Sequence, residues 1–140
     1  MSHILTNLGE EYVIKNGAIG SGFVVGLYLD ATDAISDTAD ISAITTEPSG
    51  ASYAAQSAVM EADDDGDWHA QANAAIEFDT SDSSTSVDSY YIAKSFQAVD
   101  TSDGSPTLHL LYTGALSQTR DLSQIDTLTL SLGGVGIKLS

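Results

Sequence analysis

Cysteine is absent from this 140-residue chain, which excludes disulfides, cysteine zinc sites and thiol nucleophiles. Basic residues are almost as scarce, because only Lys15, Lys94, Arg120 and Lys138 face 20 acidic residues. Phosphate binding needs clustered Lys or Arg, so the composition predicts no nucleic-acid partner. No apolar run approaches the ~20 residues of a membrane span. The first residues also lack the basic and apolar regions of a secretory signal, so we expect a soluble protein with no membrane partner.

Recognised catalytic motifs are missing as well. The sequence has no G-x-S-x-G elbow, no P-loop and no dinucleotide fingerprint. Its three histidines, His3, His69 and His109, are not spaced as zinc ligands, and we expect structural roles for them. Nothing selects a pair among the many carboxylates for glycoside cleavage. The sequence therefore predicts a protein that is not an enzyme, with no catalytic residues and no cofactor.

The net charge of −16 is the most informative global property. A surface this acidic repels itself and destabilises the compact state in dilute buffer. At roughly 1 M salt the Debye length falls to about 3 Å and most of that repulsion is screened. The acids recur from Glu10 to Asp126, and 42% of residues are hydrophobic, which argues against a disordered acidic tail. We interpret the composition as halophilic; an acidic mesophilic protein is the alternative.

The first 17 residues are predicted to form a helix and its lead. Ile4, Leu5, Leu8 and Tyr12 fall on one arc at 3.6 residues per turn, which is typical of an amphipathic helix. Ser2 is the expected N-cap and Gly17 the expected stop.

Residues 18–140 are predicted to form a β-sandwich domain that makes one structural unit with the helix. Apolar or alternating runs separated by turn residues recur along them. The fold class is therefore mainly β, an antiparallel β-sandwich or barrel of about seven strands with one N-terminal helix. The expected strands are 23–29, 53–60, 75–78, 87–96, 108–116, 127–132 and 135–139.

Two segments between these strands carry further hypotheses. Residues 30–50 read as a long loop that a partner could order. Residues 61–67 resemble the first half of an EF-hand loop, but Ala72 stands where the bidentate Glu belongs. A solvated acidic turn is the simpler interpretation. Asp63, Asp65 and Asp67 are the candidate ligands if a Ca, Mg or K ion binds there.

Five segments together resemble a family of small virion proteins of tailed phages, often described as tail or fibre proteins. The similar segments are 25–34, 47–56, 76–80, 110–116 and 125–130. Members of the family carry an arginine at the position of Ala55 and a glycine at that of Ile125. With the acidity, the resemblance implies a structural protein of a tailed virus that infects haloarchaea.

The resemblance implies a capsid decoration or turret subunit that is made in the host cytoplasm and functions in the virion under hypersaline conditions. The alternatives are a tail or fibre component that contacts the host surface, and a carbohydrate-binding module. Expected partners are major capsid or tail proteins and further copies in a trimer or pentamer. Tyr53, Tyr90, Tyr91 and Tyr112 are candidates for the oligomer contact, since tyrosine covers area at low entropic cost.

The charge predicts salt-dependent stability. We expect the melting temperature, followed by circular dichroism, to be higher in 3 M KCl than in 0.1 M KCl, because salt screens the repulsion among carboxylates. Equal melting temperatures in the two buffers would contradict the halophilic interpretation.

Overall fold

The computed structural model describes residues 5–64, 66, 68–97, 106–131 and 134–138. Within them the chain is mainly β, with eight strands and one helix near the N-terminus, which confirms the predicted fold class. The helical elements are α1 (Asn7–Gly17), the single turn α2 (Asp30–Asp33) and the 3-10 turns η1 (Ile41–Ala43) and η2 (Leu122–Gln124). The strands are β1 (Gly20–Tyr28), β2 (Gln56–Asp64), β3 (Trp68–Ala72), β4 (Ile76–Asp79), β5 (Ser86–Phe96), β6 (Thr107–Asp121), β7 (Thr127–Leu130) and β8 (Gly136–Lys138).

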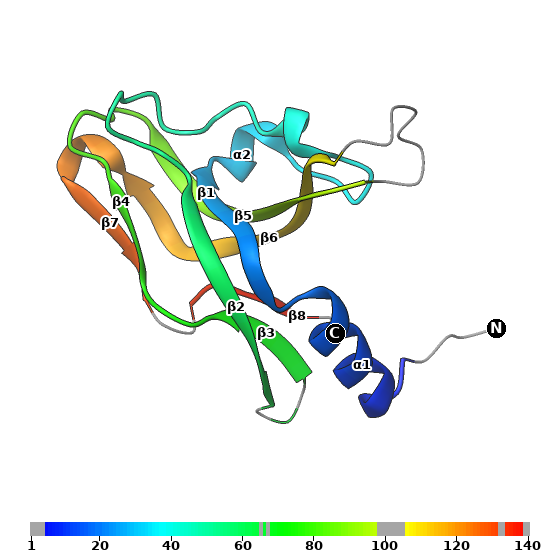
Figure 1. The fold of residues 1–140 in the computed structure, drawn as a ribbon. Helices are drawn as coiled ribbons and strands as arrows, with labels where there is room; N and C mark the ends of the chain where they lie inside the picture. The colour runs from blue at the N-terminus through cyan, green and yellow to red at the C-terminus, as the bar shows by residue number, and fades with distance from the viewer. Residues whose placement is uncertain (1–4, 65, 67, 98–105, 132–133, 139–140) are drawn as a thin grey trace.

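The strands form a nearly closed antiparallel barrel (Figure 1). Six of them make one sheet in the order β6-β5-β1-β2-β3-β8, and β4 pairs with β7 in a second, two-stranded sheet. Seven of the eight strands were predicted. The missed strand is β3, whose sequence Trp-His-Ala-Gln-Ala contains no β-branched residue and two alanines. Its strand state comes from pairing on both sides, with β2 and with β8.

One main core fills the barrel. Short strands show the expected alternation, since β4 and β7 each bury every second residue. β5 instead buries five consecutive residues, because both faces of its sheet are covered. The inner cluster includes Phe23, Phe78 and Met60, and Ile14 adds the contribution of α1. Burial of several such side chains, at roughly 1.5–3 kcal/mol each, is the main force holding the fold.

Two tyrosines of β5 lie directly against glycines of the neighbouring strands. The ring of Tyr91 covers Gly26 in β1, where an added Cβ would lie 2.2 Å from a ring carbon. The ring of Tyr90 covers Gly114 in β6 in the same way, at 2.4 Å. The two rings point to opposite faces of the sheet. On each face, a glycine without a side chain leaves the space that a tyrosine ring occupies.

Helix α1 is shorter than the sequence predicts. Its N-cap is Thr6, whose hydroxyl accepts a hydrogen bond from the Gly9 backbone N–H at 3.1 Å. The predicted cap, Ser2, lies outside the described residues. The helix ends at Gly17 as predicted, with the Ala18 N–H bonded to the Ile14 carbonyl.

The barrel is left open along one line, which we call the seam. It separates β6 on one side from β7 and β8 on the other, and β6 and β8 are the two outer strands of the six-stranded sheet. No backbone hydrogen bond joins β6 to β7 or β8 within the described part of the chain. The seam is therefore bordered by unpaired strand edges.

Replacement of Gly26 by alanine tests the ring-over-glycine arrangement. We expect G26A to destabilise the protein by about 1–3 kcal/mol, because the added methyl group must displace the buried ring of Tyr91. G17A is the matched control, since an added Cβ at Gly17 meets nothing within 4 Å. Urea unfolding should show a loss only for G26A; equal stability of the two variants would refute the packing argument.

Candidate assembly surface

Helix α1 lies against strand β3 at one end of the barrel (Figure 1). Ile14 is fully buried there, and Glu10 is nearly so. Lys15 bonds Glu11 at 2.8 Å and lies 4.7 Å from the centre of the Trp68 ring in β3. These contacts fix which side of the helix faces the barrel.

The opposite side of α1 and the residue before it expose a stripe of apolar side chains. Leu8 is 78% exposed, Tyr12 69%, Leu5 49% and Val13 42%. Leu5, Leu8 and Tyr12 have the spacing of neighbours on one helix face. The sequence predicted this apolar arc together with Ile4, which lies outside the described residues. Leu5, Leu8 and Tyr12 face outward in the single chain, and Ile14 anchors the helix in the core. We call Leu5, Leu8, Tyr12 and Val13 the α1 stripe.

The helix that carries the α1 stripe has few free carboxylates, although the molecule as a whole is strongly acidic. Its helix carries two acids, of which Glu10 is buried and Glu11 is paired with Lys15. No unpaired exposed carboxylate of α1 therefore accompanies the stripe. Two copies of charge −16 repel each other at most approaches. Contact through the stripe avoids part of that repulsion.

Residues 29–47 form a second layer on the outer face of the sheet. Ile35, Ile41 and Ile44 cover Tyr28 and Tyr91, which make a small core of their own with Ala93. Within the single chain the described loop is held by its own sheet, and ordering by a partner stays a prediction. The sequence signal for this layer was three isoleucines spaced through a polar stretch.

Aspartates attach this layer to the barrel, through Asp88, and hold it together internally, through Asp33. Asp88 of β5 accepts hydrogen bonds from the N–H groups of Asp30 and Ala31, at 2.6 and 3.2 Å, where α2 begins. Asp33 accepts bonds from the N–H and hydroxyl groups of both Thr45 and Thr46. Partial desolvation raises the pKa of Asp33, but these four hydrogen bonds outweigh it and hold the pKa below its ordinary value.

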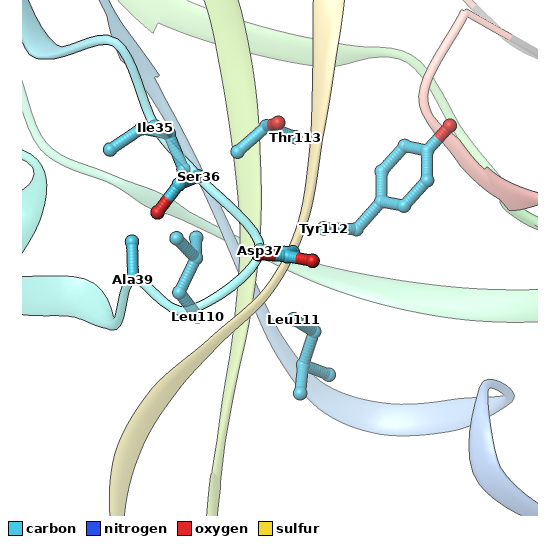
Figure 2. Close-up of a pocket in the computed structure, with 8 residues that line it drawn as sticks. All are labelled: Ile35, Ser36, Asp37, Ala39, Leu110, Leu111, Tyr112 and Thr113. Atoms are coloured by element: carbon cyan, nitrogen blue, oxygen red, sulfur yellow. The ribbon is translucent and has the colours of Figure 1, made fainter.

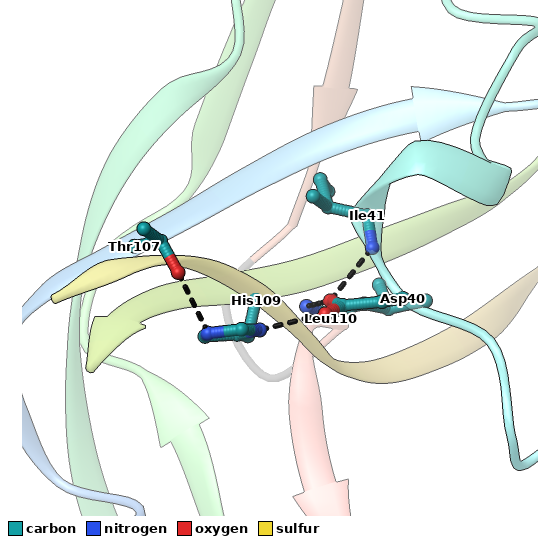
Figure 3. Close-up of polar contacts among 5 residues, drawn as sticks. All are labelled: Asp40, Ile41, Thr107, His109 and Leu110. Atoms are coloured by element: carbon teal, nitrogen blue, oxygen red, sulfur yellow. Dashed lines mark hydrogen bonds and ion pairs between the residues drawn. The ribbon is translucent and has the colours of Figure 1, made fainter. Parts of the chain in front are cut away.

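A third aspartate closes part of the edge of β6 (Figure 3). Asp40 accepts a bond from the Leu110 N–H at 2.8 Å and contacts the His109 Nδ1 at 2.6 Å. The bond from the Leu110 N–H has the largest effect on the pKa of Asp40 and lowers it. Desolvation opposes this, and the contacts with His109 and Ile41 help to keep the pKa below its ordinary value. His109 Nε2 lies 2.9 Å from the Thr107 hydroxyl, so the ring is held from both sides.

A cavity of about 340 Å³ opens beside this contact, between the loop and β6 (Figure 2). Ile35, Ala39 and Leu110 point toward one another on one side of it, while the Tyr112 ring points away. Its lining offers one carboxylate, Asp37, beside hydroxyl and aliphatic groups. That set is too sparse to define a ligand.

The four candidate tyrosines lie within the fold of one chain. Tyr90 and Tyr91 are buried, and the hydroxyls of Tyr53 and Tyr91 both donate to the Glu47 carboxylate, at 2.7 and 3.0 Å. Desolvation, together with this carboxylate, raises the pKa of both phenols. Tyr53 and Tyr112 are half-buried. The oligomer contact remains a prediction, and of the four only Tyr53 and Tyr112 keep area for it.

The structure describes the predicted ion site at the acidic turn only in part. Asp65 and Asp67 lie outside the described residues, as does His3. Asp63 lies 3.9 Å from Nε2 of the buried His69. Among the residues that the structure describes, no three His, Asp or Glu side chains gather as metal ligands. Likewise, no described helix is long and apolar enough to cross a membrane.

Comparison with known proteins adds no relative. No family model, curated protein or solved structure matches the chain.

Replacement of Asp33 tests how the outer layer is held together, because its partners Thr45 and Thr46 lie in the same loop. A carboxyl whose pKa is lowered on folding stabilises the fold above its unfolded pKa, near 3.8, and loses that contribution as the pH falls through the folded value. We expect D33N to melt a few degrees below the wild type at pH 6, and this difference to shrink below pH 4. Asp37, exposed on the same loop and without a described hydrogen bond, supplies the control D37N. A pH-independent difference for D33N would contradict the assignment.

Proposed function

We propose that this protein is a non-enzymatic structural subunit of the virion of a haloarchaeal tailed virus, most simply a capsid decoration or turret subunit. The observation that carries the proposal is the α1 stripe, an exposed apolar helix face on a chain of charge −16. Exposed apolar patches on small proteins mark interaction surfaces. The family resemblance of the sequence supports the viral part of this proposal, and the acidity of the chain supports the hypersaline part.

The size of the α1 stripe suggests how the contact is used. Four partly exposed side chains of this kind present on the order of 400 Å², about half of what each partner buries in a stable two-body interface. Such a contact is weak alone and becomes effective when several form together. Repetition around a symmetry axis of a capsid, where a trimer or pentamer would sit, provides that multiplicity.

A tail or fibre position is the second candidate and uses the same surface. A carbohydrate-binding module is the third, and it would need an accessible aromatic platform. Tyr12 is the most exposed tyrosine among the described residues, but it belongs to the apolar stripe and not to a cavity. Assembly therefore has the better support.

Light scattering in about 3 M KCl tests assembly through the α1 stripe. We expect the wild type to form a closed trimer or pentamer as its concentration rises, and L8D/Y12D to dissociate, because each substitution places a carboxylate in the apolar contact. V59D is the matched control, since Val59 is exposed on β2 outside the stripe. Equal oligomer fractions for L8D/Y12D and V59D would exclude the stripe as the contact.

The viral assignment needs its own measurement. Antibodies to the purified protein should label virus particles released from a producing haloarchaeal culture, and gold labelling should distinguish the head from the tail. Particles without label, together with binding of the isolated protein to a glycan array, would favour the carbohydrate-binding module.

A further inference from the structure

Two cavities follow the seam of the barrel. The first, of about 240 Å³, lies between Leu116 and Arg120 of β6 and Leu128 and Leu130 of β7. The second, of about 230 Å³, lies between the tyrosines of β5 and β6 and Lys138 of β8. Gly134 borders both cavities, so they adjoin. Together they make a groove along the open side of the barrel.

The strand edges beside this groove are closed by side chains only at certain points. Asp40 occupies the edge of β6 at Leu110, and the Tyr90 hydroxyl lies 3.4 Å from both the N and the O of Gly136 in β8. Along the first cavity, residues 115–120 of β6 face β7 without a backbone bond in the described residues. Open edges of this kind accept an added strand from another polypeptide.

The charges of the groove differ from those of the rest of the molecule. Arg120 lines the first cavity, whose described lining has no acidic residue, and Lys138 lines the second together with Asp63, so two of the four basic residues border the seam. Neither has an acidic partner among the described residues, whereas Lys15 is paired with Glu11 and Lys94 lies over the Phe23 ring. Carboxylates of another molecule could form ion pairs with both Arg120 and Lys138.

We propose that the seam binds an extended, acidic segment of a second copy of this chain, which adds to the free edges of β6 and β7 and places carboxylates at Arg120 and Lys138. Every copy carries acids spread through Ser-, Thr- and Ala-rich segments, so the occupant has the required charge. Its apolar side chains meet Leu116, which is half-buried, whereas Leu128 and Leu130 point into the core. Pairs formed inside the groove are screened by salt less than exposed pairs.

A contact of this kind joins unlike surfaces of the two copies. Such head-to-tail contacts generate closed rings when the rotation between neighbours allows it. The inference rests on the proposed function, because it supplies the self-association that a ring of virion subunits needs, and it adds a contact independent of the α1 stripe.

Photo-crosslinking tests the seam directly, and the absence of cysteine makes single-site labelling possible. S117C places a benzophenone in the groove, and S57C places it on an exposed position of β2 away from the seam. In 3 M KCl we expect a crosslinked dimer from S117C at least tenfold more abundant than from S57C, with the crosslink mapped by mass spectrometry to an acidic segment. Equal yields, or a crosslink confined to the labelled chain, would overturn the inference.

Charge variants separate the seam from the α1 stripe. In the S117C background, R120E/K138E should abolish the crosslinked dimer and R120K/K138R should retain it, with circular dichroism confirming that both are folded. An unchanged dimer yield in R120E/K138E would overturn the role of the cations. If light scattering shows an oligomer that depends on the α1 stripe while S117C gives no crosslink, the seam inference fails and the proposed function does not. If antibodies label virus particles but neither the stripe nor the seam forms a contact, only the viral assignment is supported.

Discussion

Carboxylates in this protein are held mainly by N–H and hydroxyl groups, because the chain has too few cations to pair them. Asp33 and Asp88 together accept bonds from four backbone N–H groups, and Asp40 accepts from Ile41 and Leu110. The outer loop, the start of α2 and the edge of β6 are fixed by these contacts. A composition that looks unfavourable for folding thus supplies acceptors for backbone groups that would otherwise face solvent or lie unpaired.

Because the chain has only four basic residues, their positions distinguish one surface from another. Lys15 and Lys94 rest on aromatic rings of the fold, over Trp68 and Phe23. Arg120 and Lys138 border the seam instead. The two surfaces that depart from the general acidity, the α1 stripe and the seam, lie on different elements of the chain.

Much of the barrel follows from sequence patterns, whereas the layer outside it does not. Alternation predicts β7, where Leu128 and Leu130 point inward, and continuous apolar residues predict β1 and β5. The strand β3 was missed because its alanines have little strand preference, and its state depends on two neighbours distant in sequence. Asp33, Asp40 and Asp88 gave no signal because their partners lie 12 to 70 residues away. The outward direction of the α1 stripe was equally hidden, since periodicity shows that a face is apolar and not what covers it.

The bonds to Asp33 within the outer loop have a consequence for stability at high ionic strength. An ion pair on a surface weakens as ions accumulate around it, whereas a hydrogen bond from an uncharged threonine hydroxyl or backbone amide to a carboxylate has no opposite charge to be screened. The hydrogen bonds from Thr45 and Thr46 to the Asp33 carboxylate therefore change little in strength as the salt concentration rises. Concentrated salt screens the repulsion among surface carboxylates, whereas the bonds that hold this loop together keep their strength.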